Sequence, residues 1–484
     1  MAVMDSVANR QPRRRRRLGG LALTVAAGLL AACALKKPPD SAEIAKDAMP
    51  TVVVPAQWTA AGAAAGDVSD NWLAGFRDDQ LMSIVYEAIV HNPNLQVTAA
   101  RVEQAELYAK LAGARLWPSV DVIAKGGGQL SGDQSGLKGA LLTATWEIDL
   151  WGRVRYGRAA AAADAASAAA DLEYARQSLA AQVAKAWFLA TEAGLQAAVA
   201  RLTIQDSEEL VRLAQSRQTI GVGNAEDVYV AQANVGTYRD ALRQIELAQE
   251  QARRAIEILV GRYPAGTAAV SPQLPPLPDA VPGGLPSTLL ERRPDVVAAE
   301  RRVAAAFNRI HEAKAARLPA ISLTTGVSAI SSELFVLQDH SNPAWNLGAN
   351  LVMPVFRGGA LKTQVEIRTA EQKQAVASYA EVGLRAFSEV EAALSAEIAA
   401  REREAILIET RAASQSALDV VRTQFKVGST DLRFVTQRQL GLNSTEAELL
   451  RVQAEQRVQR VNLHLALGGN FTTPGTFTVP KSQP

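Results

Sequence analysis

The residues that could carry out catalysis or bind a metal are few and scattered. None of the four histidines has a second ligand at the spacing of a zinc site; they are His91, His311, His340 and His464. Glu147 and Asp149 could mimic paired catalytic carboxylates, but their place in a predicted β-strand favours lining a channel. Gly221-Val222-Gly223 follows a predicted helix and lacks the third glycine of a dinucleotide-binding loop. The sequence therefore predicts no enzyme, no metal and no dissociable cofactor.

Arg293-Pro294-Asp295 is the triplet that most resembles a functional motif. Proline is favoured at the first position of a helix, and an acidic residue is favoured in its first turn. We interpret the triplet as a helix start.

Cys33 is the only cysteine of the chain, which excludes an intramolecular disulfide. Together with Leu30-Ala31-Ala32 it resembles the bacterial lipobox, whose cysteine is diacylated and becomes the first mature residue. Ala34 follows, where an aspartate tends to signal retention at the inner membrane. The resemblance implies a covalent lipid on Cys33 and transport to the outer membrane. Chance placement of the cysteine is the alternative.

The segment before Cys33 is typical of a secretory signal peptide. Five arginines, 13–17, run directly into an apolar stretch, 18–32, followed by small residues at the cleavage site. This stretch is shorter than the ~20 apolar residues of a membrane-spanning helix. A basic nucleic-acid arm is the alternative, but the net charge of the chain is only +2, so we expect no nucleic-acid partner.

Two parts of the chain follow one pattern. Residues 93–118 and 294–319 are helical stretches bounded by prolines, each followed by two β-like stretches and a very long helix. A glycine, Gly221 or Gly428, breaks each long helix, and a further helix follows. One unit of about 200 residues is thus used twice. The predicted organisation is a signal peptide (1–32), a lipidated extension (33–77), a first repeat (78–263), a Pro-rich linker (264–285), a second repeat (286–469) and a tail (470–484).

The predicted helices are unusually long. No proline interrupts residues 153–218 or 361–425. Sixty-odd residues at ~1.5 Å each give a length of roughly 100 Å, far beyond an average globular helix. Small residues allow close helix approach, and interspersed Leu, Val and Ile are typical of coiled-coil seams. An exported fibrous coiled coil is the alternative, but it leaves the strands unexplained.

Four segments, 120–125, 140–151, 321–328 and 345–353, alternate between apolar and polar residues. This period of two is typical of transmembrane β-strands, with apolar side chains toward lipid and polar side chains toward a lumen. A soluble half-buried sheet is the alternative. The residues that we expect to line the lumen are Thr143, Thr145, Glu147, Asp149, Ser322, Thr324, Asn346 and Asn350.

Four strands per chain require an oligomer. An open sheet edge cannot be left in hydrocarbon, because its backbone groups find no water there. Two chains would give eight strands, a barrel filled by side chains, whereas three give twelve strands and room for a pore. We therefore expect a homotrimer.

Several segments resemble the outer-membrane efflux lipoproteins of the NodT/OprM type, the TolC-like outer membrane factor family. They are LPSTLLERRPD at 285–295 with AERR at 299–302, WEIDLWG at 146–152, LHLALGG at 463–469, and Asp70-Asn71-Trp72 with Phe76-Arg77-Asp78. The resemblance covers the chain from the lipobox to about Phe471.

The resemblance implies a mainly α protein with a membrane β-barrel. Three chains would form a twelve-stranded barrel, continued by a twelve-helix α-barrel in the periplasm. It also implies contact with outer-membrane lipid, and docking to a periplasmic adaptor protein and an inner-membrane pump, commonly of the proton-driven resistance-nodulation-division type. The implied function is passive export of drugs or toxic compounds. Type I protein secretion or metal-ion efflux through such a channel is the first alternative, and a structural lipoprotein without transport is the second.

In that family, side chains just after the helix-breaking glycines close the periplasmic end of the tunnel. Asp227 matches the usual first-copy aspartate, whereas Gln437 stands where many relatives have a second aspartate. Arg433 stands where a bulky apolar residue is common. Three symmetry-related arginines would add their fields in a narrow channel and make it less attractive to cations; an Arg433 that points into a helix–helix groove is the alternative. The expected aperture residues are Asp227, Asp431, Arg433 and Gln437.

Overall fold

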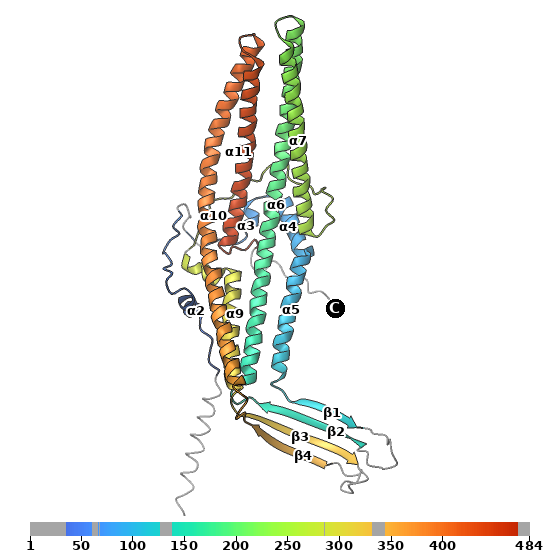
Figure 1. Cartoon of the computed structure of the whole chain (residues 1–484), viewed down its shortest axis with the longest axis vertical. Coiled ribbons are helices and arrows are strands. Elements are labelled where there is room, and N and C mark those ends of the chain that lie inside the picture. Colours follow the sequence, from blue (N-terminus) through green and yellow to red (C-terminus); the bar gives the residue numbers. More distant parts are fainter. Residues whose placement is uncertain are drawn as a thin grey trace, which may run out of the picture. The chain divides into compact units, whose positions relative to one another are not determined.

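The structure is a computed structural model that describes residues 35–60, 66, 68–125, 138–284, 286–331 and 344–472. Cys33 and the predicted signal peptide lie outside the described residues. The elements in chain order are α2 (Ser41–Ala48), α3 (Trp72–Gly75), α4 (Asp79–His91), α5 (Pro93–Ala114), β1 (Ser119–Lys125), β2 (Lys138–Ile148), α6 (Arg153–Thr219), α7 (Ala225–Val260), η1 (Pro286–Thr288), α8 (Leu289–Arg292), α9 (Pro294–Ala315), β3 (Ala320–Ser331), β4 (Ala344–Val352), α10 (Ala360–Lys426) and α11 (Leu432–Ala466) (Figure 1).

The elements of the two repeats occur in the predicted order. A helix of 22 residues, α5 or α9, leads into two strands, a helix of 67 residues, α6 or α10, and a further helix. The long helices begin and end within one residue of the predicted bounds, so the internal duplication and the long helices are confirmed. None of the helices in the described part of the chain combines the length and apolar composition of a membrane span.

The described chain forms two compact units, and each takes residues from both repeats. The first contains all four strands, residues 35–48, and the parts of α5, α6, α9 and α10 next to the strands. The second contains α3, α4, α7, α11, the linker between the repeats and the remaining parts of the long helices. The repeat is therefore a unit of sequence, whereas packing joins corresponding parts of both copies.

The strands form one antiparallel sheet in the order β1-β2-β3-β4. Its register places Val122 opposite Leu142, Leu142 opposite Val327 and Val327 opposite Trp345. Because alternate residues point to opposite faces, these apolar side chains share one face. Among the described residues, neither β1 nor β4 has a partner strand along its outer edge.

Aromatic residues before α4 lie at the centre of the core of the second unit. The rings of Trp72 and Phe76 meet edge to face with 6.3 Å between centroids. Phe76 is completely buried and packs on Phe188 of α6 at 5.0 Å. Asp78 caps α4 and accepts a hydrogen bond from the indole N–H of Trp187 at 3.0 Å. The N-terminal Trp/Phe-Asp element thus fastens the start of the first repeat to α6.

Equivalent positions in the two repeats join the start of one helix to the end of another. The Asn92 side chain donates a hydrogen bond to a carbonyl in the last turn of α7 at 2.8 Å, and Arg293 donates to the carbonyl of Ala466 in α11 at 3.2 Å. Arg293 is 1% exposed and forms ion pairs with Asp295 and Glu389 at 2.8 and 2.7 Å. The interpretation of Arg293-Pro294-Asp295 as only a helix start is therefore incomplete, because Arg293 is a buried charge that joins α9, α10 and α11.

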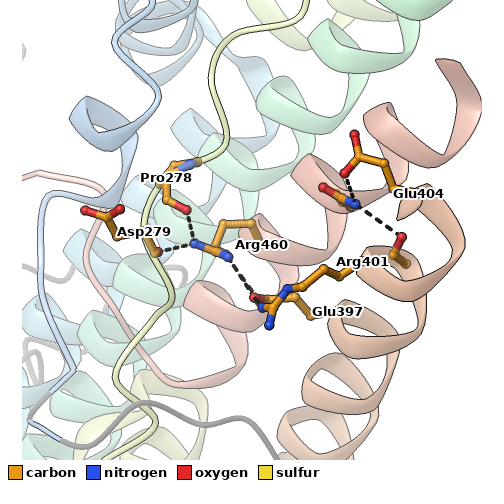
Figure 2. Close-up of polar contacts among 8 residues, drawn as sticks. Pro278, Asp279, Glu397, Arg401, Glu404 and Arg460 are labelled. Atoms are coloured by element: carbon orange, nitrogen blue, oxygen red, sulfur yellow. Dashed lines mark hydrogen bonds and ion pairs between the residues drawn. The ribbon is translucent and has the colours of Figure 1, made fainter. Parts of the chain in front are cut away.

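Buried charges also hold the linker between the repeats. Glu257 of α7 accepts hydrogen bonds from the backbone N–H groups of residues 266–268 at 2.7–2.9 Å. Arg460 of α11, 1% exposed, donates to the carbonyls of residues 278 and 279 and pairs with Glu397 of α10 at 2.7 Å (Figure 2). The proline-rich linker, which has little hydrogen bonding of its own, is thereby attached at two points.

Gly221 and Gly428 end the two 67-residue helices in the same way. Their φ angles are +77° and +83°. The N–H of the residue after each glycine bonds to the carbonyl five residues earlier: Val222 to Arg217 at 3.0 Å and Ser429 to Gln424 at 2.9 Å. This is the Schellman arrangement, which needs a left-handed residue and therefore favours glycine.

Replacing Arg460 by Met should destabilise the protein by about 3 kcal/mol, because the buried Glu397 carboxylate loses its inner partner. Arg401→Met is the matched control. Arg401 pairs with the same carboxylate at 3.2 Å, but its side chain is 58% exposed, so the loss should stay below about 1 kcal/mol. Chemical denaturation measures the unfolding free energy of both variants. Equal losses in Arg460→Met and Arg401→Met would contradict the larger role of the buried arginine.

Replacing Gly428 by Ala should destabilise the protein by about 1 kcal/mol, because a Cβ is strained at a left-handed φ. Gly441→Ala, within α11, should instead stabilise it by about 0.5–1 kcal/mol, since a Cβ there meets nothing within 4 Å. The thermal unfolding midpoint should fall for Gly428→Ala and rise for Gly441→Ala. A Gly428→Ala protein as stable as the natural one would disprove this explanation of the helix end.

Candidate functional site

The described residues contain no group of three or more side chains that could hold a metal ion. The histidines that can be placed have other neighbours. His91 lies 3.2 Å from a carbonyl of its own helix, and His311 packs against two aromatic rings. His464 stacks on Trp72, and burial lowers the pKa of its imidazole to about 3, so it stays neutral at physiological pH. His340 lies outside the described residues.

The predicted lumen residues share one face of the sheet, with one exception. The register aligns Thr145 with Thr324, and Glu147 with Ser322, which in turn lies opposite Asn350. Thr143 and Asn346 lie on the same face, because both are opposite residue 326 of β3. The polar face predicted from alternation is therefore present, and its role in lining a lumen stays a prediction.

The exception is Asp149, which we expected on the strand. Strand β2 ends at Ile148, and the Asp149 carboxylate accepts hydrogen bonds from the backbone N–H groups of Val154 and Arg155 at 3.0 and 2.9 Å. It also pairs with the Arg155 side chain at 3.1 Å. The expected strand was therefore too long, because this carboxylate binds the unpaired N–H groups at the start of α6.

The opposite face of the sheet is apolar and uncovered in the single chain. Val122, Trp345 and Leu347 are 71%, 77% and 83% exposed. A contiguous apolar surface of this kind marks contact with lipid or with another protein. The indole N–H groups of Trp146 and Trp151 are satisfied by backbone carbonyls at 2.9 and 2.8 Å, as expected of tryptophans that lie where apolar and polar surroundings meet.

Three of the predicted aperture residues lie close together beyond the helix-breaking glycines. Asp431 and Arg433 form an exposed ion pair at 3.4 Å. The Arg433 side chain is 76% exposed in the single chain, and its role at an aperture stays a prediction. The fourth residue, Gln437, lines a groove between α10 and α11 together with Arg438.

The charges near Asp227 act on one another. Partial burial raises the pKa of the Asp227 carboxyl, and the negative charge of Asp431 raises it further, while Arg217 and Arg433 oppose both effects. Asp227 therefore loses its negative charge at a higher pH than an ordinary aspartate. Since Asp431 and Arg433 come from the second repeat, this site is built from both copies.

The helices α6 and α7 form one helical hairpin, and α10 and α11 form another. The sequence did not reveal the contacts that connect these two hairpins near their turns. Arg217, in the last turn of α6, donates a hydrogen bond to the carbonyl of Phe425 at 2.7 Å, and its guanidinium lies 4.8 Å from the centre of the Phe425 ring. Arg422 of α10 donates to Asp206 of α6 at 2.9 Å. A basic residue is favoured in the last turn of any helix, so Arg217 gave no specific signal.

Two segments of the chain match one family model. The model described as outer membrane efflux protein covers residues 84–262 and again residues 285–469, in agreement with the duplication of the elements.

Relatives match over nearly their whole length. Cation efflux system protein CusC of Escherichia coli O6:H1 is 28% identical, over 87% of this chain and 94% of that protein. Pyoverdine export outer membrane protein OpmQ of Pseudomonas aeruginosa is 28% identical, over 93% of this chain and 97% of that protein. The open-state outer membrane channel MtrE of Neisseria gonorrhoeae superposes with a TM-score of 0.76 at 25% identity, over 91% and 99%. The chain belongs to the outer membrane efflux protein family, the outer-membrane channels of efflux systems, which extend into the periplasm.

Proposed function

We propose that three copies of this chain form a passive conduit that exports small molecules from the periplasm to the exterior. The observation that carries the proposal is the sheet, which has one polar face, one exposed apolar face and, among the described residues, two edges without a partner strand. In hydrocarbon the unpaired backbone groups of β1 and β4 need partners, so β4 of one copy pairs with β1 of the next. Three copies close a ring of twelve strands that leaves a lumen, whereas eight strands would be filled by side chains.

Exposed apolar side chains on the helices support an assembly of several copies. Val97 and Leu107 on α5 are 51% and 54% exposed, and Leu384 on α10 is 47% exposed. Burial of such side chains contributes ~25 cal/mol per Å² of apolar surface. A ring in which α5 of one copy packs beside α10 of the next would cover them and continue the strand barrel as a helical barrel.

The proposed conduit also has a lipid anchor on Cys33 and two protein partners. Residues 35 and 36, the first described after Cys33, lie against Gly152 and Tyr156 at the start of α6, next to the strands. A lipid on Cys33 would therefore insert close to the level of the barrel in the outer membrane. A periplasmic adaptor protein and an inner-membrane pump of the proton-driven type, the partners common in this family, supply the energy and select the cargo.

Matched substitutions on the two faces of β4 test the conduit. Leu347→Asp places a charge on the lipid side of each copy and should lower the yield of trimers in outer membranes severalfold, because charge is unfavourable on the lipid face. Asn346→Asp, one residue earlier and on the polar face, should insert normally and conduct in planar bilayers. Normal assembly of Leu347→Asp, or absence of conductance in the natural protein, would refute the conduit.

Replacing Arg433 by Asp should raise the ratio of cation to anion permeability by roughly twofold or more, because three added negative charges replace three positive ones in a narrow passage. Reversal potentials of single channels in a salt gradient measure this ratio. Arg438→Asp makes the same charge change in the α10–α11 groove and should have little effect. If Arg433→Asp leaves the selectivity unchanged, Arg433 does not act at the aperture.

A further inference from the structure

A cavity of about 460 Å³ lies between α5, α6 and α9 in the first compact unit. Its wall combines apolar side chains, among them Tyr108 and Val154, with four arginines. The arginines are Arg115, Arg153, Arg158 and Arg309. Pockets of this size commonly hold drug-sized molecules, with a few polar groups that fix their orientation.

Two of these arginines have acidic partners and two do not. Arg153 donates to Glu147 at 3.1 Å, and Arg309 pairs with Asp164. In the part of the chain that the structure describes, neither a hydrogen bond nor an ion pair engages the guanidinium groups of Arg115 and Arg158. The cavity therefore offers two guanidinium groups that remain available to an anion.

Two glycines leave room for the charged groups between the helices. A Cβ on Gly113 of α5 would lie 3.5 Å from Nε of Arg158. A Cβ on Gly157 of α6 would lie only 3.0 Å from a carboxylate oxygen of Glu312 on α9. The charged side chains thus lie directly against helix backbone, and a larger residue at position 113 would occupy the space beside Arg158.

One residue of the cavity wall adjoins the polar face of the sheet. Arg153, on the cavity wall, contacts Glu147, which belongs to that face. Gly152 and Tyr156, which contact the N-terminal residues Leu35 and Lys36, are absent from the wall. In the proposed conduit we therefore place the cavity on the lumen side, once in each of three copies.

We propose that this cavity binds the acidic group of an amphipathic organic anion in transit, such as a carboxylate, a sulfonate or a phosphate ester with an apolar body. A guanidinium donates paired hydrogen bonds to such oxygens, and the exposed side chains of Tyr108 and Leu111 on the cavity wall offer an apolar surface for the body of the molecule. The cargo class of this channel then includes organic anions. This assignment rests on the conduit proposed above.

Single-channel block in planar bilayers tests the site with two probes that share one ring system. Naphthalene-1-sulfonate and 1-naphthylmethylammonium, of opposite charge, are added on the extracellular side. The anion should block the natural channel at a concentration at least tenfold lower than the cation. Arg115→Gln combined with Arg158→Gln should raise the blocking concentration of the anion about tenfold and should not raise that of the cation. Gly113→Leu, which places a larger side chain beside Arg158 and keeps every charge, should weaken block by the anion as well.

Arg243→Gln is the control, because it removes a highly exposed arginine of α7 that lies outside the cavity. The anion should block this variant like the natural channel. Equal block by both probes, unaltered block of the double variant, or an equal loss in Arg243→Gln would overturn the anion site while leaving the conduit intact. A natural protein that does not conduct would instead refute the conduit.

Discussion

The backbone groups along the outer edges of β1 and β4 are the constraint on which the assembly depends. A chain that places this sheet in a membrane has to pair every N–H and C=O group, because water is absent there. Four strands twist but cannot close on themselves, so in the proposed conduit the missing partners come from other copies. The helices then follow, since each of the four strands continues directly into one of the helices α5, α6, α9 and α10. Closure of the sheet therefore also brings these helices into a ring.

Buried charges fix how the connecting segments attach to the helices. Arg293, Arg460 and Glu257 each bind backbone groups as well as side chains or further backbone. Removing a charge from water is costly, and the cost is offset only when its hydrogen bonds are satisfied. Such a residue therefore accepts few alternative arrangements of its neighbours. The glycines at the helix ends also restrict the arrangement of the chain, because the left-handed backbone at Gly221 and Gly428 determines where each long helix ends and the chain reverses.

The two copies of the repeat place different side chains at corresponding positions. Asn92 and Arg293 occupy equivalent positions, and each donates a hydrogen bond to a carbonyl at the end of another helix. The donor is a side-chain amide in the first copy and a guanidinium in the second. Beyond the glycines, the first copy contributes Asp227 and the second contributes Asp431 and Arg433. A duplicated backbone thus supplies the architecture, and unequal side chains give corresponding positions different charges. The Arg217 guanidinium, at the end of α6, binds the end of α10 through the carbonyl and the ring of Phe425.

The sequence by itself determined the elements and their faces. Periods of two and of about three and a half residues, prolines and glycines act locally, so the strands, the two 67-residue helices and the polar face of the sheet could be predicted from residue order. The exact end of β2 could not, because it depends on Asp149 binding the start of α6. Only the tertiary structure revealed the buried role of Arg293, the joint between Arg217 and Phe425, and the cavity with Arg115 and Arg158. Each of these unites residues far apart in sequence, and such contacts are set by how the helices pack, which no local pattern encodes.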